Sequence, residues 1–205
     1  MLRIGDKAPA FTLPDQSGSL QDTKSLKGRR YLVYFYPKDS TPGCTVQACG
    51  LQSDLAQFNG LGIAVLGVSM DSVASHRKFA DKYGLQFPLL ADTGKSLIEA
   101  YGVWIEKSLY GKKYMGISRS SFLVGGNGKI EQVWEKVNTK THAQDVLAFI
   151  VGDNAMEKPM TKTTAKKTNG EKQSDLVRKA VAVKKPAAKK APVKKAPVKK
   201  TVKKK

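Results

Sequence analysis

The chain has 205 residues, with 36 Lys and Arg against 17 Asp and Glu, and its formal net charge is +19. That length allows one ordinary domain and an additional segment. It contains no apolar run near the ~18 residues of a membrane span, and its N-terminus lacks the apolar stretch of a signal peptide, so we expect a soluble, cytoplasmic protein.

Short apolar runs rich in β-branched and aromatic residues predict strands at residues 31–36 and 63–69. Between them, four apolar side chains recur every three or four residues, which predicts one helix over residues 44–59. This stripe consists of Ala48, Leu51, Leu55 and Phe58.

The rest of the first 152 residues continues the alternation of strands and helices. A Gly-rich turn at residues 125–128 joins the last two predicted strands as a hairpin. This order predicts a thioredoxin-like α/β fold, a central mixed sheet flanked by helices on both faces. The further predicted strands are residues 88–91, 121–124 and 130–134, and the further helices are residues 73–83, 95–101 and 141–150.

The positive charge is concentrated at the C-terminal end. Residues 156–205 hold 18 Lys and Arg against 3 Asp and Glu, so they contribute 15 of the 19 net charges. The last five pentads, VAVKK, PAAKK, APVKK, APVKK and TVKKK, each end in a Lys pair. Such a segment has too little apolar surface to offset its ordering entropy. We therefore expect a folded domain at residues 1–152 and a disordered Lys/Ala/Pro-rich tail at residues 153–205.

Cys44 follows the first predicted strand after a turn rich in Pro, Asp, Ser and Gly, and it begins the predicted helix. The unpaired N–H groups of a helix N-terminus stabilise a thiolate, which is the nucleophilic form of cysteine. The Thr41 hydroxyl is near enough in sequence to donate a hydrogen bond to the sulfur or to a substrate oxygen. The alternative is a small core residue, because free Cys is often buried. The polar, Pro-bounded approach favours a reactive thiol.

Cys49 is the only other cysteine. On one helix it would point about 140° away from Cys44, with the two Cα atoms about 8 to 9 Å apart. A disulfide requires a Cα separation below about 7 Å. The two thiols therefore cannot bond in an intact helix, although a redox cycle that unwinds its first turns stays possible. The spacing also differs from the C-x-x-C of a thioredoxin-type reductant.

The segment TPGCTVQAC, with Pro37 upstream, matches the P-x-x-x-T-x-x-C signature of peroxiredoxins. With its second Cys five positions on, it resembles the bacterioferritin-comigratory-protein or PrxQ subfamily. The similarity also covers GDKAPAFTLPDQSG, VSMDSVASHRKFADKYGLQFPLLAD and YGVWIEKSLYGKKYMGISRSSFLV. It extends over nearly all of residues 2–152 and over none of the tail.

The resemblance implies a thiol peroxidase in which Cys44 is the peroxidatic cysteine and is oxidised to a sulfenic acid by a peroxide. It implies that Arg119 stabilises the thiolate and orients the peroxide, that Thr41 hydrogen-bonds the reacting oxygens, and that Pro37 shields the sulfenic acid from water. Cys49 would be the resolving cysteine, and thioredoxin or a similar dithiol would reduce the resulting intramolecular disulfide.

The resemblance requires no metal or other cofactor, and it suggests a monomer. Gln47 departs from it, because many relatives have Glu there; we expect little loss, but a hydrogen bond of the family is in doubt. Outside the motif, we expect Trp104 and Trp134 to be packing or edge aromatics. We expect His76 to lie on the surface of its helix. His142 is at a predicted helix start and need not do chemistry.

The paired lysines of the tail resemble the tails of linker histones and of some bacterial nucleoid proteins. A cationic chain of this kind suits phosphates, and without a base-reading element we expect no sequence preference. The tail would then bind DNA or another polyanion and associate the protein with the nucleoid; otherwise it is a solubilising segment without a dedicated partner. The alternative to a peroxidase is a polyanion-binding nucleoid protein whose globular part is a non-catalytic scaffold.

Overall fold

The structure is a computed structural model that describes residues 1–109 and 111–156. Residues 157–205, which include the pentads of the expected tail, lie outside the described residues. The helix predicted over residues 141–150 begins at His142 and continues to Met156. No helix in the described part of the chain has both the length and the hydrophobicity to cross a membrane.

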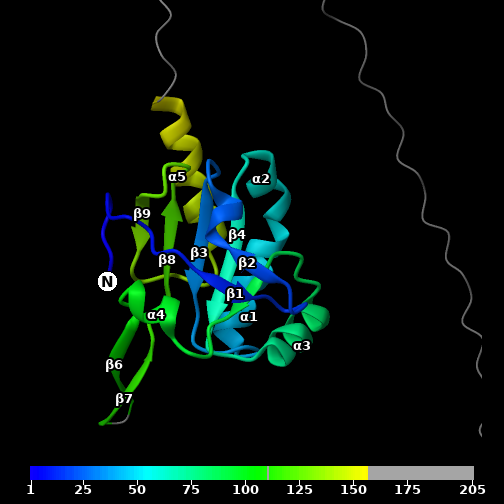
Figure 1. Cartoon of the computed structure of the whole chain (residues 1–205), viewed down its shortest axis with the longest axis vertical. Helices are drawn as coiled ribbons and strands as arrows, with labels where there is room; N and C mark the ends of the chain where they lie inside the picture. The colour runs from blue at the N-terminus through cyan, green and yellow to red at the C-terminus, as the bar shows by residue number, and fades with distance from the viewer. Residues whose placement is uncertain (110, 157–205) are drawn as a thin grey trace, which may run out of the picture. The chain divides into compact units, whose positions relative to one another are not determined.

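A five-stranded mixed sheet in the order β5-β4-β3-β8-β9 lies at the centre of the fold (Figure 1). β3 pairs in parallel with β4 and β4 with β5, whereas β8 pairs antiparallel with both β3 and β9. All five predicted strands are confirmed, and no end differs by more than one residue. The strands are β3 Tyr31–Phe35, β4 Ala64–Ser69, β5 Leu89–Ala91, β8 Ser120–Val124 and β9 Ile130–Trp134.

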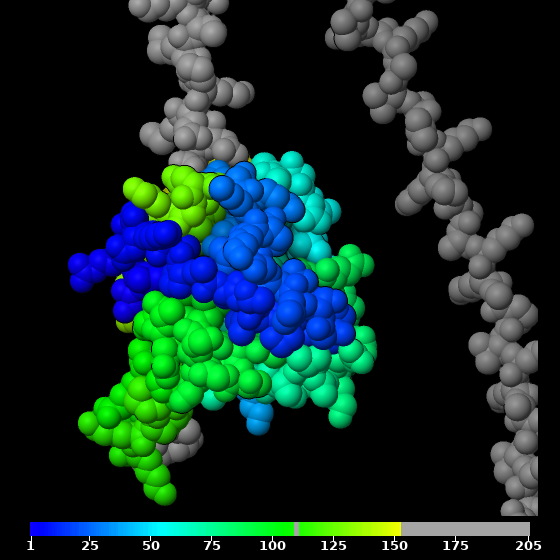
Figure 2. All heavy atoms as spheres, viewed as in Figure 1, coloured from blue at the N-terminus to red at the C-terminus, as the bar shows by residue number. Residues whose placement is uncertain are grey.

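Helices cover both faces of this sheet, as predicted. They are α1 Pro42–Ser53, α2 Leu55–Gly60, α3 Val73–Tyr83, α4 Ser96–Ala100 and α5 His142–Met156. Alternate side chains of β3 belong to two separate hydrophobic cores, because successive residues of a strand face opposite sides. Leu32 and Tyr34 pack in the core that includes α1, α2, α3 and α5. Tyr31 and Val33 pack with α4 and with the N-terminal segment, which crosses the face seen in Figure 2.

The helix predicted over residues 44–59 is divided in two at Asp54, whose backbone has φ −98° and ψ 6°. The Asp54 carboxylate accepts hydrogen bonds from Gln57 and from Gln144 of α5. Asp favours such side-chain bonding over helix interiors. The predicted apolar stripe is nevertheless buried throughout, and its members are Ala48, Leu51, Leu55 and Phe58.

Two hairpins were not predicted. β1 Thr12–Pro14 and β2 Leu20–Asp22 form one, and β6 Trp104–Leu109 and β7 Lys112–Ile117 form the other. The second hairpin extends away from the sheet (Figure 1) and has charged residues on both strands, so it lacks the alternating apolar pattern of a buried strand. It leads directly into β8 and so adjoins the end of β3.

Candidate active site

The sheet brings two distant segments together at one end. In the antiparallel pairing of β3 and β8, the last residue of β3, Phe35, is opposite Ser120, the first residue of β8. The turn after β3 leads to Cys44, and Arg119 immediately precedes β8. The topology therefore places Arg119 beside the thiol although 75 positions separate them.

Cys44 lies in the first turn of α1. Thr41 is the N-cap residue, with an extended backbone at φ −82° and ψ 149°, and Pro42 occupies the first helical position, where its missing N–H costs nothing. Cys44 is 1% exposed. Its sulfur thus lies near the positive end of a helix in a site from which water is largely excluded.

Arg119 contacts both Cys44 and Gln47 of the same helix. Its Nη2 donates to the Cys44 Sγ at 3.2 Å, and its Nη1 donates to the Gln47 Oε1 at 2.7 Å. A Cβ at Gly43 would lie 3.3 Å from the Arg119 Nη2, so this position favours glycine for the close approach of the guanidinium. Gln47, which departs from the Glu of many relatives, thus accepts from the guanidinium through its amide oxygen.

The geometry agrees with what comparisons with known proteins find. The AhpC/TSA family profile matches residues 4–133. The chain is 47% identical over 149 residues to peroxiredoxin Bcp of Escherichia coli, covering 73% of this chain and 96% of that protein. It is 45% identical over 146 residues to a Coxiella burnetii protein named as a Bcp peroxiredoxin, covering 71% and 97%.

Among solved structures, the bacterioferritin comigratory protein of Xanthomonas campestris, which has alkyl peroxide reduction activity, is 40% identical with a TM-score of 0.67. The match covers 70% of this chain and 91% of that protein. The chain is a peroxiredoxin of the Bcp/PrxQ family. The enzyme is accordingly a thiol peroxidase, an oxidoreductase with a thioredoxin-like fold, and the family resemblance inferred from the motif is confirmed.

The remaining motif residues of the peroxiredoxin lie around the start of α1. The Thr41 hydroxyl donates to the Lys38 carbonyl at 3.1 Å, which leaves its oxygen lone pairs for another donor. Pro37 is exposed in the turn between β3 and α1. Cys49 is half-buried farther along α1, and both thiols are free.

His142 joins the site from α5, a contact that the sequence reasoning missed. Its Nδ1 lies 3.2 Å from the Gln47 Nε2, and both residues are buried. Burial lowers the pKa of His142 to about 4; the Asp145 carboxylate opposes this shift and the Arg119 charge adds to it. The imidazole is therefore neutral at physiological pH.

Lys107 of the β6–β7 hairpin is a second cation near the thiol. Its Nζ donates to the Ile117 carbonyl. Burial, and then the charge of Arg119, lower the pKa of Lys107, while the Cys44 charge acts in the opposite direction. The hairpin that the sequence did not reveal thus contributes to the electrostatic environment of the site.

His76 was expected on the surface of its helix, and this prediction is wrong. The residue is 0% exposed in the structure. Its Nδ1 lies 2.9 Å from the Asp39 Oδ2 and its Nε2 lies 3.2 Å from the Leu90 carbonyl oxygen. It is three residues before the buried Phe79 on α3, a helical spacing that indicated the same buried face.

Asp39 anchors the turn before Cys44. Its carboxylate accepts from the Tyr36 hydroxyl at 2.8 Å and from the Ser75 hydroxyl at 2.7 Å, and its backbone N–H donates to Asp71. Burial alone would raise the pKa of Asp39, but the hydrogen bond and charge of His76, with the two hydroxyls, outweigh burial and lower it. The turn is therefore fixed to α3 by an ionised, hydrogen-bonded carboxylate.

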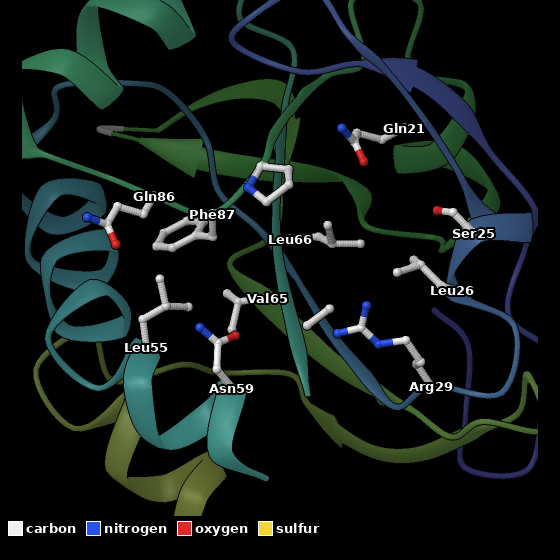
Figure 3. A pocket seen from close by; sticks show the side chains of 12 residues that line it. Gln21, Ser25, Leu26, Arg29, Leu55, Asn59, Val65, Leu66, Gln86 and Phe87 are labelled. Atoms are coloured by element: carbon white, nitrogen blue, oxygen red, sulfur yellow. The ribbon is translucent and has the colours of Figure 1, made fainter. Parts of the chain in front are cut away.

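A separate cavity of about 300 Å³ lies at the other end of the sheet (Figure 3). It is lined in part by Ala64 and Val65, at the start of β4, whereas Cys44 follows the end of the parallel strand β3. In Figure 3, Leu55, Val65 and Phe87 lie toward one side of the cavity and Arg29 toward the other. None of the predicted site residues lines it. In the described residues, no group of three His, Cys, Asp or Glu side chains is arranged to hold a metal.

Proposed function

We propose that Cys44 is the peroxidatic cysteine of this enzyme. The observation that supports it most strongly is the 3.2 Å contact between the Arg119 Nη2 and the Cys44 Sγ at the start of α1. A guanidinium and a helix N-terminus both favour the thiolate, which is the attacking form. The same cation is positioned to hydrogen-bond a peroxide oxygen as negative charge develops on it.

In the proposed reaction the Cys44 thiolate attacks the terminal oxygen of a peroxide, forming an S–O bond as the O–O bond breaks. The leaving oxygen takes a proton and departs as water or an alcohol, and the cysteine becomes a sulfenic acid. The Thr41 oxygen, whose proton is donated to the Lys38 carbonyl, accepts a hydrogen bond from the peroxide O–H. Pro37, at the exposed side of the turn, limits the access of water to the sulfenic acid.

Cys49 then resolves the sulfenic acid. Its thiol attacks the Cys44 sulfur, an S–S bond forms, and the sulfenic oxygen leaves as water. Because both residues belong to α1, the helix must open around them before the sulfurs meet. A dithiol such as thioredoxin returns both cysteines to thiols by exchange.

The proposed substrates are hydrogen peroxide and organic hydroperoxides. The alkyl peroxide reduction activity of the X. campestris relative, 40% identical to this chain, supports the organic class. We further propose a monomer in the cytoplasm.

The proposal is tested by following peroxide consumption with thioredoxin as donor. Cys44→Ser should abolish it. Cys49→Ser should permit a single oxidation of Cys44, detected by a sulfenic acid probe, without turnover. Full turnover by Cys44→Ser would refute the assignment. Absence of turnover in the unaltered chain would instead favour the alternative of a non-catalytic scaffold.

A second proposed function belongs to residues 153–205, and the observation that favours it is their repeated Lys pairs. We propose that they bind DNA or another polyanion without sequence preference and bring the peroxidase to the nucleoid. Each neutralised phosphate contributes about 0.9 to the slope of log affinity against log salt. A chain ending at Met156 keeps α5 complete and should lose DNA binding and the salt slope. Equal, weak binding by both chains would refute this proposal.

A further inference from the structure

The start of α5 supplies a buried polar group that the proposed peroxide chemistry does not use. His142 is 2% exposed, and its Nδ1 contacts the Gln47 Nε2 at 3.2 Å. The rings of Tyr34 and Trp134 pack against the imidazole, with centroid distances of 6.5 and 6.4 Å. Its Nε2 is buried without a hydrogen-bond partner among the described residues. Burying a polar group without a partner costs free energy, so a role for His142 in the site would account for its position.

The donors and acceptors along this contact permit one arrangement. A guanidinium only donates, so the Gln47 amide must direct its oxygen toward the Arg119 Nη1, 2.7 Å away. The amide nitrogen then faces His142, and because that nitrogen also only donates, the Nδ1 must accept. His142 is thus neutral with its proton on Nε2, in agreement with its lowered pKa.

We infer that His142 is a positioning residue for Arg119 at Cys44. By accepting from Gln47, it keeps the amide oxygen directed at Arg119, and that oxygen holds the guanidinium with its other nitrogen against the Cys44 sulfur. Without an acceptor at Nδ1, the Gln47 amide nitrogen is either unsatisfied or turned toward Arg119, where two donors face each other. The inference rests on the proposed role of Cys44 as the reactive thiol.

Two substitutions separate this role from simple packing. In His142→Asn, the side-chain oxygen occupies nearly the position of Nδ1 and can still accept from Gln47. In His142→Leu no acceptor remains, although the site stays filled. His142→Gln moves the amide toward the Nε2 position and is a second variant without an acceptor at Nδ1, should the Leu variant not fold.

The readout is the rate at which iodoacetamide alkylates Cys44 at neutral pH, in a Cys49→Ser background so that one thiol reacts. This rate follows the thiolate and requires no peroxidase activity. We expect His142→Leu to slow alkylation about tenfold, as for loss of one hydrogen bond. His142→Asn should stay within about twofold of its parent. In a Gln47→Leu background, His142→Leu should have no further effect.

Three results would overturn the inference: an unchanged rate in His142→Leu, equal slowing in the Leu and Asn variants, or slowing that persists in the Gln47→Leu background. Peroxide consumption by the unaltered chain is measured separately. A chain that shows the expected alkylation series but consumes no peroxide would overturn the proposed function and leave the positioning role in place.

Discussion

Two buried polar networks flank the segment that contains Cys44, and they are satisfied to different degrees. The turn network consists of Tyr36, Asp39, Ser75 and His76, and the helix network consists of Gln47, Arg119 and His142. In the first, a carboxylate accepts from two hydroxyls and pairs with a histidine. In the second, no carboxylate of the described residues pairs with the cation, and one imidazole nitrogen has no partner.

The difference indicates a division of labour. In the turn network, the Asp39 carboxylate is bonded by side chains of the network itself. The network therefore fixes the backbone before Cys44 and offers no unpaired positive charge to a further anion. In the helix network Arg119 interacts with a neutral amide, and its charge therefore stays available to the sulfur and to an incoming peroxide. Substitutions in the turn network should therefore chiefly change stability at neutral pH, whereas substitutions in the helix network should chiefly change reactivity.

The largest effect is expected in the turn network. Asp39→Asn removes the charge partner of the fully buried His76, and breaking a buried pair costs several kcal/mol, so we expect about 3 to 4 kcal/mol less stability in urea unfolding. Asp145→Asn, which alters an exposed carboxylate of α5, is the control and should cost less than about 1 kcal/mol. Equal losses of stability in the two variants would show that the turn network has no special stabilising role.

The helix network should give the protein a stability loss in mild acid. The pKa of His142 is about 4 in the folded chain against 6.5 for the free group, so unfolded chains bind the proton first as pH falls. Stability from this group is complete above pH 6.5 and is lost between about 6.5 and 4, by about 3 kcal/mol at most. The free energy of unfolding measured in urea should vary less across that pH range in His142→Asn than in the unaltered chain. The lowered pKa of Asp39 affects stability at more acidic pH, because the stability from its carboxylate is lost as the pH falls below 3.8.

Arg119→Met should chiefly affect reactivity. Loss of a charged donor at a reacting centre costs about 100-fold, so we expect that reduction in the rate of Cys44 oxidation by hydrogen peroxide, measured by rapid mixing. Stability should change by less than about 1 kcal/mol, because the side chain is only half-buried. In the control Lys82→Met, which removes an exposed cation on α3, Cys44 should be oxidised at the parent rate. A slow Lys82→Met variant would point to net charge rather than to the position of Arg119.

Gln47→Glu should have the smallest effect. A carboxylate would pair with Arg119 and compete with the sulfur for its charge, and it would no longer donate to the neutral His142. We expect oxidation of Cys44 to slow about threefold, as for a modest electrostatic change. Gln52→Glu adds the same charge farther along α1 and provides the control. Faster oxidation in Gln47→Glu would contradict the role assigned to the neutral amide.

The thiol segment could be predicted because its signals are local. An apolar strand, a Pro- and Gly-rich turn and a stripe of apolar side chains lie within 31 consecutive residues, 31–61, and the structure has β3, α1 and α2 there. Arg119 could not be found in this way, because its approach to Cys44 depends on the pairing of β8 with β3. Only the family motif pointed to it.

The buried histidines show a second limit. The hydrophobic pattern includes no acceptor or donor, so it cannot distinguish a surface histidine from one that is hydrogen-bonded in a core. His76 is buried because Asp39 and Leu90 satisfy both of its nitrogens. Asp39 lies in the turn before α1, and Leu90 lies on β5. His142 is buried against Gln47, 95 positions away. Partners at such separations become visible only when the fold is known.

The interruption at Asp54 has a consequence for how far a conformational change can spread. Helical segments melt cooperatively, and a residue outside helical geometry ends the cooperative unit. Cys44 and Cys49 both lie in the unit that ends at Ser53, whereas α2 is anchored separately in the core by Leu55 and Phe58. In the proposed cycle, the segment that opens is therefore α1, and its buried Ala48 and Leu51 separate from the core while Leu55 and Phe58 hold α2 in place.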